Sequence, residues 1–331
     1  MAEYINIKGQ NIEVVASDPA NPTIGQIWYN STSNTLKGGG VTTAGAWATG
    51  NNMNAGRREF AGAGIQTAGL AFGGNVNPGL SGATEEYDGN SWTNSNPLNT
   101  ARAGNAGAGT QTAGLAFGGF GPTYTGATEE YDGNSWTNNP TGLNTARAYP
   151  GGTGTQTAAL AFGGEPGGSP PVVGATEEYN GATWASNPTG LNTARSVMGS
   201  AGTQTAGLAF GGTFNPGLSG ATEEYDGSTW TSNPTGLNTA RQYLAGCGIQ
   251  TAALAFGGNT GTYIAAAEEY DGSTWTSVTS LSTARGLLAG LGTQTAALAF
   301  GGAPAPIPGG LTATEEWTGA GAPTTKTITV S

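Results

Sequence analysis

One unit recurs six times along the chain, and this repetition limits the available folds more than any other feature. The copies are marked by glutamines that lie 45, 45, 48, 46 and 44 residues apart: Gln66, Gln111, Gln156, Gln204, Gln250 and Gln294. A complete copy contains an apolar segment ending in Phe-Gly-Gly, a variable loop, a Glu-Glu pair, a Trp and a connecting loop ending in Arg. Self-similarity at a period of about 20–50 residues is the signature of solenoids, propellers and related arrays.

Side-chain size alternates with a period of two within each unit, which predicts strands rather than helices. In residues 207–210, Leu208 and Phe210 face one way while Gly207 and Ala209 face the other. Asp226-Gly227 is a strong signal for a tight turn between two strands, because Gly accepts a positive φ there. Four short strands in about 46 residues describe one blade of a β-propeller. We therefore predict an all-β fold with a six-bladed β-propeller over residues 41–320, each blade having four antiparallel strands.

The order of the marker residues resembles the kelch repeat over about residues 46–317. The resemblance is carried by Gly211-Gly212, then Tyr225, then Trp230, then Arg241, and by the equivalent residues of the other copies. It implies a kelch-like propeller. The interval of five residues from Tyr225 to Trp230 is shorter than in the family.

The ends of the chain predict how the ring of blades closes. The sixth copy stops at Trp317 without the usual outer strand, and Trp47 lies ten residues before Arg57, as Trp92 does before Arg102. We expect the segment around Trp47 to be the outer strand of the C-terminal blade, which would remove exposed sheet edges. The alternative is that residues 325–330 supply this strand. If the Trp47 segment supplies it, we expect residues 321–331 to form a C-terminal β tail.

Residues 1–40 are predicted to form a separate, small β module with a hairpin over residues 25–37. Residues 17–30 resemble the opening segment of structural and tail-fibre proteins of tailed bacteriophages, especially marine ones. The resemblance implies that this module attaches to other virion proteins and that the propeller is displayed. A plain hairpin that caps the propeller is the alternative. The first residues lack the pattern of a signal peptide, so we expect synthesis in the host cytoplasm and a final location in the virion.

Composition excludes several kinds of site. The chain has no His and one Cys, so Ser-His-Asp or Cys-His catalysis, Cys/His zinc sites and an intrachain disulfide are excluded. A net charge of −11 disfavours nucleic acid as a partner, and no apolar run is long enough for membrane insertion. We expect no enzyme activity, no cofactor and no metal.

Charged residues recur with the repeat, although they make up only 9% of the chain. Burying a charge without a partner costs several kcal/mol, so the repetition of both signs predicts inter-blade ion pairs. The predicted arginines are Arg57, Arg102, Arg147, Arg195, Arg241 and Arg285, and their predicted partners are Glu86, Glu130, Glu178, Glu224, Glu269 and Glu316.

Two segments vary between copies: the loop after each Gly-Gly pair and the three residues after each Arg. In an up-and-down meander both lie at the same end of the sheet, so they predict one variable face on a constant scaffold, as in recognition proteins. The predicted ligand-binding residues are Phe60, Phe120, Tyr124, Tyr149, Phe214, Tyr243 and Tyr263. Exposed aromatic rings offer stacking surfaces to sugars and proteins.

These features favour a non-enzymatic virion protein of the tail-fibre or appendage type, present as a homo-oligomer or in many copies. Its variable face would bind a host-surface glycan or protein. One alternative is a capsid- or tail-decorating protein without a receptor. The other is a carbohydrate-active enzyme that uses carboxylates alone, such as Asp88, Asp132, Asp226 or Asp271.

Overall fold

The computed structural model describes residues 12–19, 25–41, 44–167, 172–214, 217–304, 309–321 and 323–328. The chain divides into two compact units, Ala46–Thr318 and a smaller one made of Met1–Gly45 with Gly319–Ser331. The described residues contain strands and no helix, so no helix among them could span a membrane.

The repeats of the larger unit fold into four-stranded antiparallel sheets. The first sheet contains β5 (Ala61–Ile65), β6 (Ala68–Phe72), β9 (Thr84–Tyr87) and β10 (Trp92–Ser95), and the second contains β11 (Ala106–Gly109), β12 (Gly114–Phe117), β13 (Thr128–Tyr131) and β14 (Trp136–Asn139). The third contains β15 (Gly151–Thr155), β16 (Ala158–Phe162), β17 (Thr176–Tyr179) and β18 (Trp184–Asn187), and the fourth contains β19 (Gly199–Gly202), β20 (Gly207–Phe210), β23 (Thr222–Tyr225) and β24 (Trp230–Asn233).

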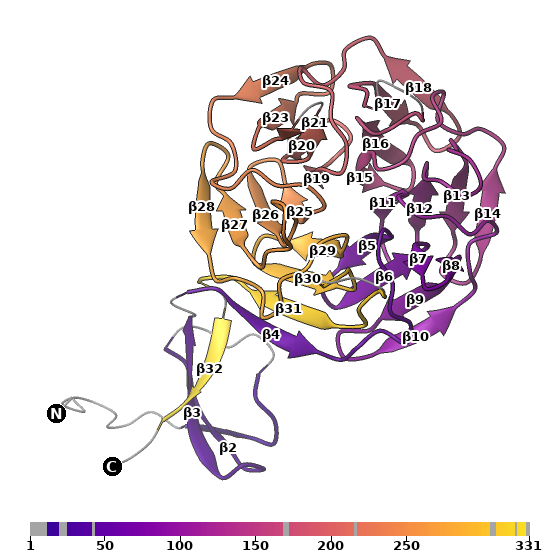
Figure 1. The fold of residues 1–331 in the computed structure, drawn as a ribbon. Helices are drawn as coiled ribbons and strands as arrows, with labels where there is room; N and C mark the ends of the chain where they lie inside the picture. Colours follow the sequence, from indigo (N-terminus) through magenta and orange to yellow (C-terminus); the bar gives the residue numbers. More distant parts are fainter. Residues whose placement is uncertain are drawn as a thin grey trace. The chain divides into compact units, whose positions relative to one another are not determined.

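The remaining sheets continue the series. The fifth contains β25 (Ala245–Ile249), β26 (Ala252–Phe256), β27 (Ala267–Tyr270) and β28 (Trp275–Val278), and the sixth contains β29 (Ala289–Thr293), β30 (Ala296–Phe300), β31 (Thr314–Thr318) and β4 (Ala46–Gly50). Short hairpins, β7 (Asn75–Val76) with β8 (Gly79–Leu80) and β21 (Thr213–Phe214) with β22 (Gly217–Leu218), lie in the loops. The first strand of each sheet lies nearest the centre in Figure 1, an arrangement that fits a β-propeller.

The strand around Trp47 completes the sheet that contains the last repeat. β4 pairs with β31 in antiparallel fashion, and Trp47 lies opposite Trp317. The ring centroids of these two residues are 5.2 Å apart, and that of Trp47 lies 5.1 Å from that of Phe256. The C-terminal strand β32 (Pro323–Thr327) pairs instead with β3 (Thr35–Val41) of the smaller unit. The C-terminal segment is therefore a strand of that unit's sheet.

The smaller unit is a sheet in the order β1-β2-β3-β32, where β1 (Glu13–Val15) runs parallel to β2 (Ile27–Asn30) and the predicted β2–β3 hairpin is present. The Asp18 carboxylate accepts hydrogen bonds from Trp28, Asn30 and Lys37 at 3.1, 2.7 and 2.5 Å, which lower its pKa to about 2. Residues 20–24 of the phage-like segment lie outside the described residues.

The tight turns explain the recurring Asp-Gly dipeptide. Asp226 Oδ1 accepts the backbone N–H groups of Ser228 and Thr229 at 2.9 and 2.7 Å, and Gly227 has a φ of 90°. A side chain other than Gly rarely adopts this backbone conformation. The carboxylate is therefore part of the turn that joins the third and fourth strands.

Neighbouring sheets pack together because aromatic rings of one sheet lie against glycines of the next. The Trp136 ring centroid lies 4.8 Å from that of Phe72 in the preceding sheet, and Trp136 Nε1 donates to the Thr84 hydroxyl at 2.9 Å. A Cβ added to Gly107 would lie 2.7 Å from Cζ of Phe72. Because a packed interior has no room for such an atom, the small face of one sheet accepts the bulky face of its neighbour.

The predicted arginines are all buried, with 0% exposure, and each forms an ion pair with the following sheet. The prediction that the second glutamate of each pair is the partner is wrong for Glu86, Glu130, Glu178, Glu224, Glu269 and Glu316. The partners are instead the first glutamates: Glu85, Glu129, Glu177, Glu223, Glu268 and Glu315. Consecutive residues of a strand point to opposite faces. The first glutamate faces the connecting segment that carries the arginine, and the second faces the next sheet.

Arg57 remains charged despite its burial. Burial lowers the pKa of Arg57 to about 10, while the charge and hydrogen bond of Glu85 oppose this change. The Glu85 carboxylate also accepts the backbone N–H of Asn54 at 2.6 Å, so one carboxylate binds both the side chain and the backbone of the connecting segment.

The second glutamate of a pair binds a tyrosine of the next sheet. The hydroxyls of Tyr87, Tyr131, Tyr179, Tyr225 and Tyr270 donate to Glu316, Glu86, Glu130, Glu178 and Glu224. Burial raises the pKa of these tyrosines and the bonded carboxylate raises it further, to about 12 for Tyr131. The hydroxyls therefore stay protonated and act as donors.

Glu269 breaks this pattern. In the next sheet, Trp317 occupies the position of the tyrosine. In other repeats an asparagine of the fourth strand also binds the second glutamate, as Asn187 binds Glu178 and Asn233 binds Glu224. Val278 occupies the position of that asparagine. The Glu269 carboxylate consequently makes no hydrogen bond within the described residues, and burial raises its pKa. The sixth sheet thus packs against a half-buried carboxylate for which the described residues supply no partner.

We predict that Arg195→Met lowers the free energy of unfolding by about 3–5 kcal/mol, because it leaves the buried Glu223 carboxylate unpaired. The double variant Arg195→Met/Glu223→Gln should recover part of this loss. Thermal denaturation followed by circular dichroism measures both. An equal loss in the exposed-turn variant Asp226→Asn would contradict the assignment.

We also predict that Glu269→Gln raises stability at neutral pH. A carboxyl whose pKa is raised by folding favours the folded state at low pH and opposes it once pH exceeds the folded pKa. The Tm advantage of the variant should grow as pH rises above about 4, near the ordinary pKa of glutamate, and should level off above the folded pKa. Glu224→Gln is the matched control: it weakens the bond from Tyr270 and should lower Tm at neutral pH. Equal effects of both substitutions would refute the prediction.

Candidate functional site

Six equivalent residues, which we call the axial ring, form a closed cycle of backbone hydrogen bonds. They lie two positions after each arginine and are Glu59, Gly104, Tyr149, Val197, Tyr243 and Leu287. Each backbone N–H donates to the carbonyl of its equivalent in the preceding repeat at 2.7–3.3 Å, and Glu59 N–H donates to Leu287 O at 2.9 Å.

The axial ring is a strained element. All six residues have a φ between 50° and 61°, although only one of them is Gly. A side chain in this region costs of order 1–3 kcal/mol, and such residues cluster at binding sites and active sites. The surrounding sheets impose this conformation on five residues of different kinds, which makes the ring a candidate site.

The variable loops are joined to the axial ring. The residue after each arginine pairs with the residue after a Gly-Gly pair, as in the bridges of Arg58 with Asn75, Ala103 with Phe120 and Gln242 with Asn259. We use the name loop face for the axial ring together with the segments that follow the six Gly-Gly pairs. The two variable parts of the repeat therefore lie at one end of the sheets.

Aromatic side chains meet at the axial ring. The ring centroid of Tyr149 lies 5.7 Å from that of Phe120 and 6.3 Å from that of Tyr243, and Phe120 lies 6.5 Å from Tyr124. A Cβ added to Gly104 would lie 2.9 Å from the Tyr149 ring, so glycine at this position makes room for that ring. Four of the predicted ligand-binding residues thus form one aromatic arc.

Charged groups lie beside this arc. Tyr149 donates its hydroxyl to Glu59 Oε2 at 2.9 Å, and Arg58 Nε lies 3.2 Å from Glu59 Oε1. In the same repeat as Tyr149, Glu165 accepts a hydrogen bond from the Ser196 hydroxyl of the next repeat at 2.8 Å. Burial raises the pKa of Tyr149 and the Glu59 charge raises it further, so this tyrosine remains a hydrogen-bond donor.

The other predicted residues lie in different surroundings. Phe60 is only 6% exposed, and its ring centroid lies 5.6 Å from that of Phe300, so it belongs largely to the core. It also borders the cavity described below. Phe214 is 36% exposed and makes no ring contact with the arc among the described residues. Tyr263 is partly buried, and its ring lies 2.7 Å from where a Cβ of Gly286 would be.

Three charged residues in or beside the loop face were not among the residues predicted from the sequence. Glu59 and Glu165 are the only glutamates of residues 46–318 outside the six Glu-Glu pairs, and Arg58 is the only cation there outside the six repeated arginines. A charge that departs from a strict repeat was therefore the signal that could have identified them.

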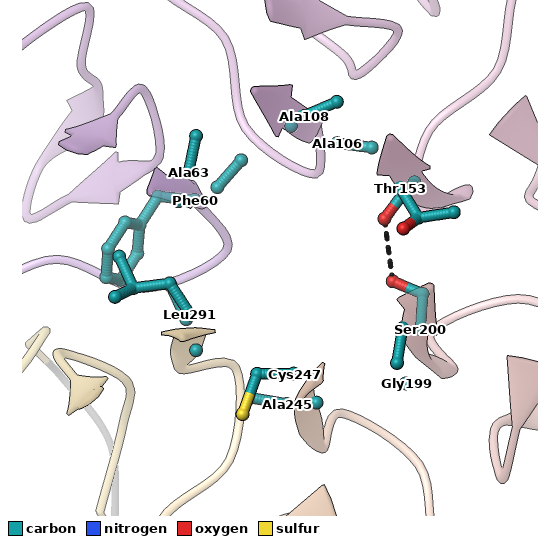
Figure 2. Close-up of a pocket in the computed structure, with 18 of the residues that line it drawn as sticks. Phe60, Ala63, Ala106, Ala108, Thr153, Gly199, Ser200, Ala245, Cys247 and Leu291 are labelled. Atoms are coloured by element: carbon teal, nitrogen blue, oxygen red, sulfur yellow. Dashed lines mark hydrogen bonds between the residues drawn. The ribbon is translucent and has the colours of Figure 1, made fainter. Parts of the chain in front are cut away.

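A cavity of about 250 Å³ is lined by the axial ring and by the first strands of the sheets. Phe60, Ala63, Ala108, Cys247 and Leu291 surround it in Figure 2. Those first strands are edge strands, so their outer edges present backbone polar groups toward the centre. The cavity thus combines apolar side chains with a polar backbone.

Asn105 is an exception in the cavity wall. It is 7% exposed, and neither its amide nitrogen nor its oxygen has a hydrogen-bond partner in the described part of the chain. Equivalent positions in the fifth and sixth sheets are occupied by Leu244 and Leu288. The Asn105 oxygen lies 2.7 Å from where a Cβ of Gly73 would be, in the slot that Leu244 fills beside Gly211.

The turn aspartates have no feature of a general acid. Asp88, Asp132, Asp226 and Asp271 are exposed, and hydrogen bonds from backbone N–H groups lower the pKa of each. A general acid needs a raised pKa instead. Within the described residues, no group of three or more Asp, Glu, His or Cys residues could hold a metal ion.

No protein-family model matches the chain, and no curated protein matches it either.

We predict that Asn105→Leu raises the free energy of unfolding by about 1–2 kcal/mol, because it removes a buried amide that has no partner. The reverse exchange, Leu244→Asn, is the matched control and should destabilise the protein by about 2–4 kcal/mol. Thermal denaturation measures both. A lower Tm for Asn105→Leu would mean that the amide is satisfied, for example by water.

Proposed function

We propose that the larger unit is a six-bladed, kelch-like propeller closed by β4, and that it serves as a non-enzymatic adhesion subunit of a tailed-phage virion. The closed cycle of the axial ring supports six blades. The pairing of β4 with β31 supports closure between the two ends of the repeat array. Gln66 donates to Ala297 O and Trp317 O of the sixth sheet at 3.0 and 2.8 Å, as Gln111 donates to the first sheet. The junction of the sixth and first sheets thus repeats the contacts of the others.

One observation carries the adhesion function: the residues that depart from the repeat collect on the loop face. Repeated side chains hold sheets together, whereas Arg58, Glu59 and Glu165 have no counterpart in another repeat and each member of the aromatic arc has at most one aromatic counterpart. Tyr124 and Phe214 are 39% and 36% exposed at this end. A constant scaffold with variable loops is the organisation of recognition proteins. The ligand is a host-surface glycan or protein.

The virion assignment rests on the resemblance of residues 17–30 to the opening segments of phage structural and tail-fibre proteins. The smaller unit is then the attachment part, and the protein is present in many copies on the particle. β32 belongs to the same sheet as β2 and β3, so both ends of the chain contribute to this part.

We predict that the purified, labelled protein binds some members of a panel of whole bacterial cells. Replacing Phe120, Tyr124, Phe214 and Tyr263 together by Ala should abolish binding, because it removes the aromatic surface. The control replaces Ile65 and Ile249, both 54% exposed at the far ends of β5 and β25, by Thr. Cell binding retained by the fourfold variant would refute the loop face as the binding surface. Absence of cell binding by the unchanged protein would refute the adhesion function and favour a decorating protein without a receptor.

We further predict that a variant without residues 1–45 and 319–331 is absent from particles, because it lacks the attachment unit. Particle proteins are detected by mass spectrometry after complementation with the variant chain. The fourfold loop-face variant should still be incorporated. Normal incorporation of the truncated chain would contradict the assignment of the smaller unit.

A further inference from the structure

We infer that the loop face binds a single terminal sugar residue without negative charge, held in the cavity where the axial ring lines it. This inference rests on the proposed function, because it names the class of ligand that the adhesion face takes. It is carried by three observations: the size of the cavity, the tyrosine hydroxyls beside the axial ring that have no hydrogen-bond partner among the described residues, and the sign of the local charge.

The cavity limits the size of the ligand. Pockets that enclose drug-sized ligands have volumes of about 300–1,000 Å³, and this cavity has about 250 Å³. It is therefore large enough for one ring-sized group and too small for a longer chain. Because its wall presents backbone polar groups between apolar side chains, it suits a ring that has both hydroxyl groups and C–H faces.

The polar groups at the axial ring suit hydroxyls. The Tyr243 and Tyr263 hydroxyls make no hydrogen bond within the described residues, and Glu59 is held in place by Arg58 and Tyr149. A sugar hydroxyl both donates and accepts, so it can donate to a fixed carboxylate and accept from a tyrosine. The Tyr149 and Tyr243 rings, 6.3 Å apart, provide apolar faces for the C–H groups of the sugar.

Charge excludes acidic sugars. The loop face has two carboxylates, Glu59 and Glu165, against one cation, Arg58, which is already paired with Glu59. The pKa of Tyr243 is raised by burial and then by the negative fields of Glu165 and Glu59. The whole chain has a net charge of −11. A ligand carboxylate or phosphate would lose its hydration here without gaining a cation, whereas a neutral or amine-bearing sugar would not.

The test is a glycan array that contains bacterial glycans ending in neutral, amine-bearing and acidic sugars, run beside the panel of whole cells. We expect the bound glycans to end in neutral or amine-bearing residues. Bound glycans that end in uronic acid, sialic acid or phosphate would overturn the inference and leave the adhesion function intact. Cell binding without binding to any glycan would also overturn it, in favour of a protein receptor. Absence of cell binding would refute the adhesion function itself.

Variants place the site at the axial ring. Tyr243→Phe removes a hydroxyl without changing the ring and should weaken binding to the best glycan about tenfold. Glu59→Gln should weaken binding to an amine-bearing ligand more than binding to a neutral one. Ile249→Thr, at the opposite end of β25, is the matched control and should leave affinity unchanged. Unchanged affinity in both Tyr243→Phe and Glu59→Gln would refute the placement, and equal Tm values of the folded variants would exclude unfolding as the cause.

Discussion

The buried ion pair between each repeated arginine and the first glutamate of the following sheet is the interaction on which the rest of the structure depends. The backbone carbonyl of Arg102 accepts the N–H of Gly74 in the preceding sheet at 2.8 Å, while its side chain lies 3.1 Å from Glu129 in the following sheet. One residue therefore ties two sheets together. A buried pair adds little net stability, but loss of one partner leaves an unpaired charge in the interior. Such a pair penalises any other register between neighbouring sheets.

The sequence predicted the strands and their order because these depend on local patterns. The alternation of Leu208 and Phe210 with small residues, and the Asp226-Gly227 turn, identify strands and turns that the structure contains. The position of Trp47 followed from the incomplete last repeat. The sequence did not show which glutamate of each pair binds the repeated arginine. Alternation along a strand places the two glutamates on opposite faces of the sheet, but it does not tell which face the connecting segment covers. That depends on how the chain passes from one sheet to the next.

The axial ring lay beyond sequence reasoning for a similar reason. Nothing in Glu59, Val197 or Leu287 favours a positive φ, and neighbouring sheets impose it by fixing where the chain enters each first strand. The aromatic residues were found because they vary, whereas Glu59 and Glu165 were missed because glutamate is common in the repeats. A charge outside the repeat is rarer here than an aromatic residue outside it, so it was the more specific signal.

The junction between the fifth and sixth sheets lacks contacts that the other junctions make, and it lies beside the sheet in which β4 joins the last repeat. Trp317 replaces the tyrosine that would bind Glu269, Ala267 replaces the Thr that would bind Trp47, and Trp47 Nε1 donates to Thr279 O at 3.0 Å instead. These changes form one coupled set around the two Trp rings. The cost is a half-buried Glu269 carboxylate that has no hydrogen-bond partner among the described residues, and it falls on a contact between two sheets. Asymmetry on the loop face is not such a repair. Tyr149 donates to Glu59, and Ser196 donates to Glu165, without replacing a contact that the other repeats make. We therefore attribute the side chains that depart from the repeat here to the ligand that we propose for the loop face.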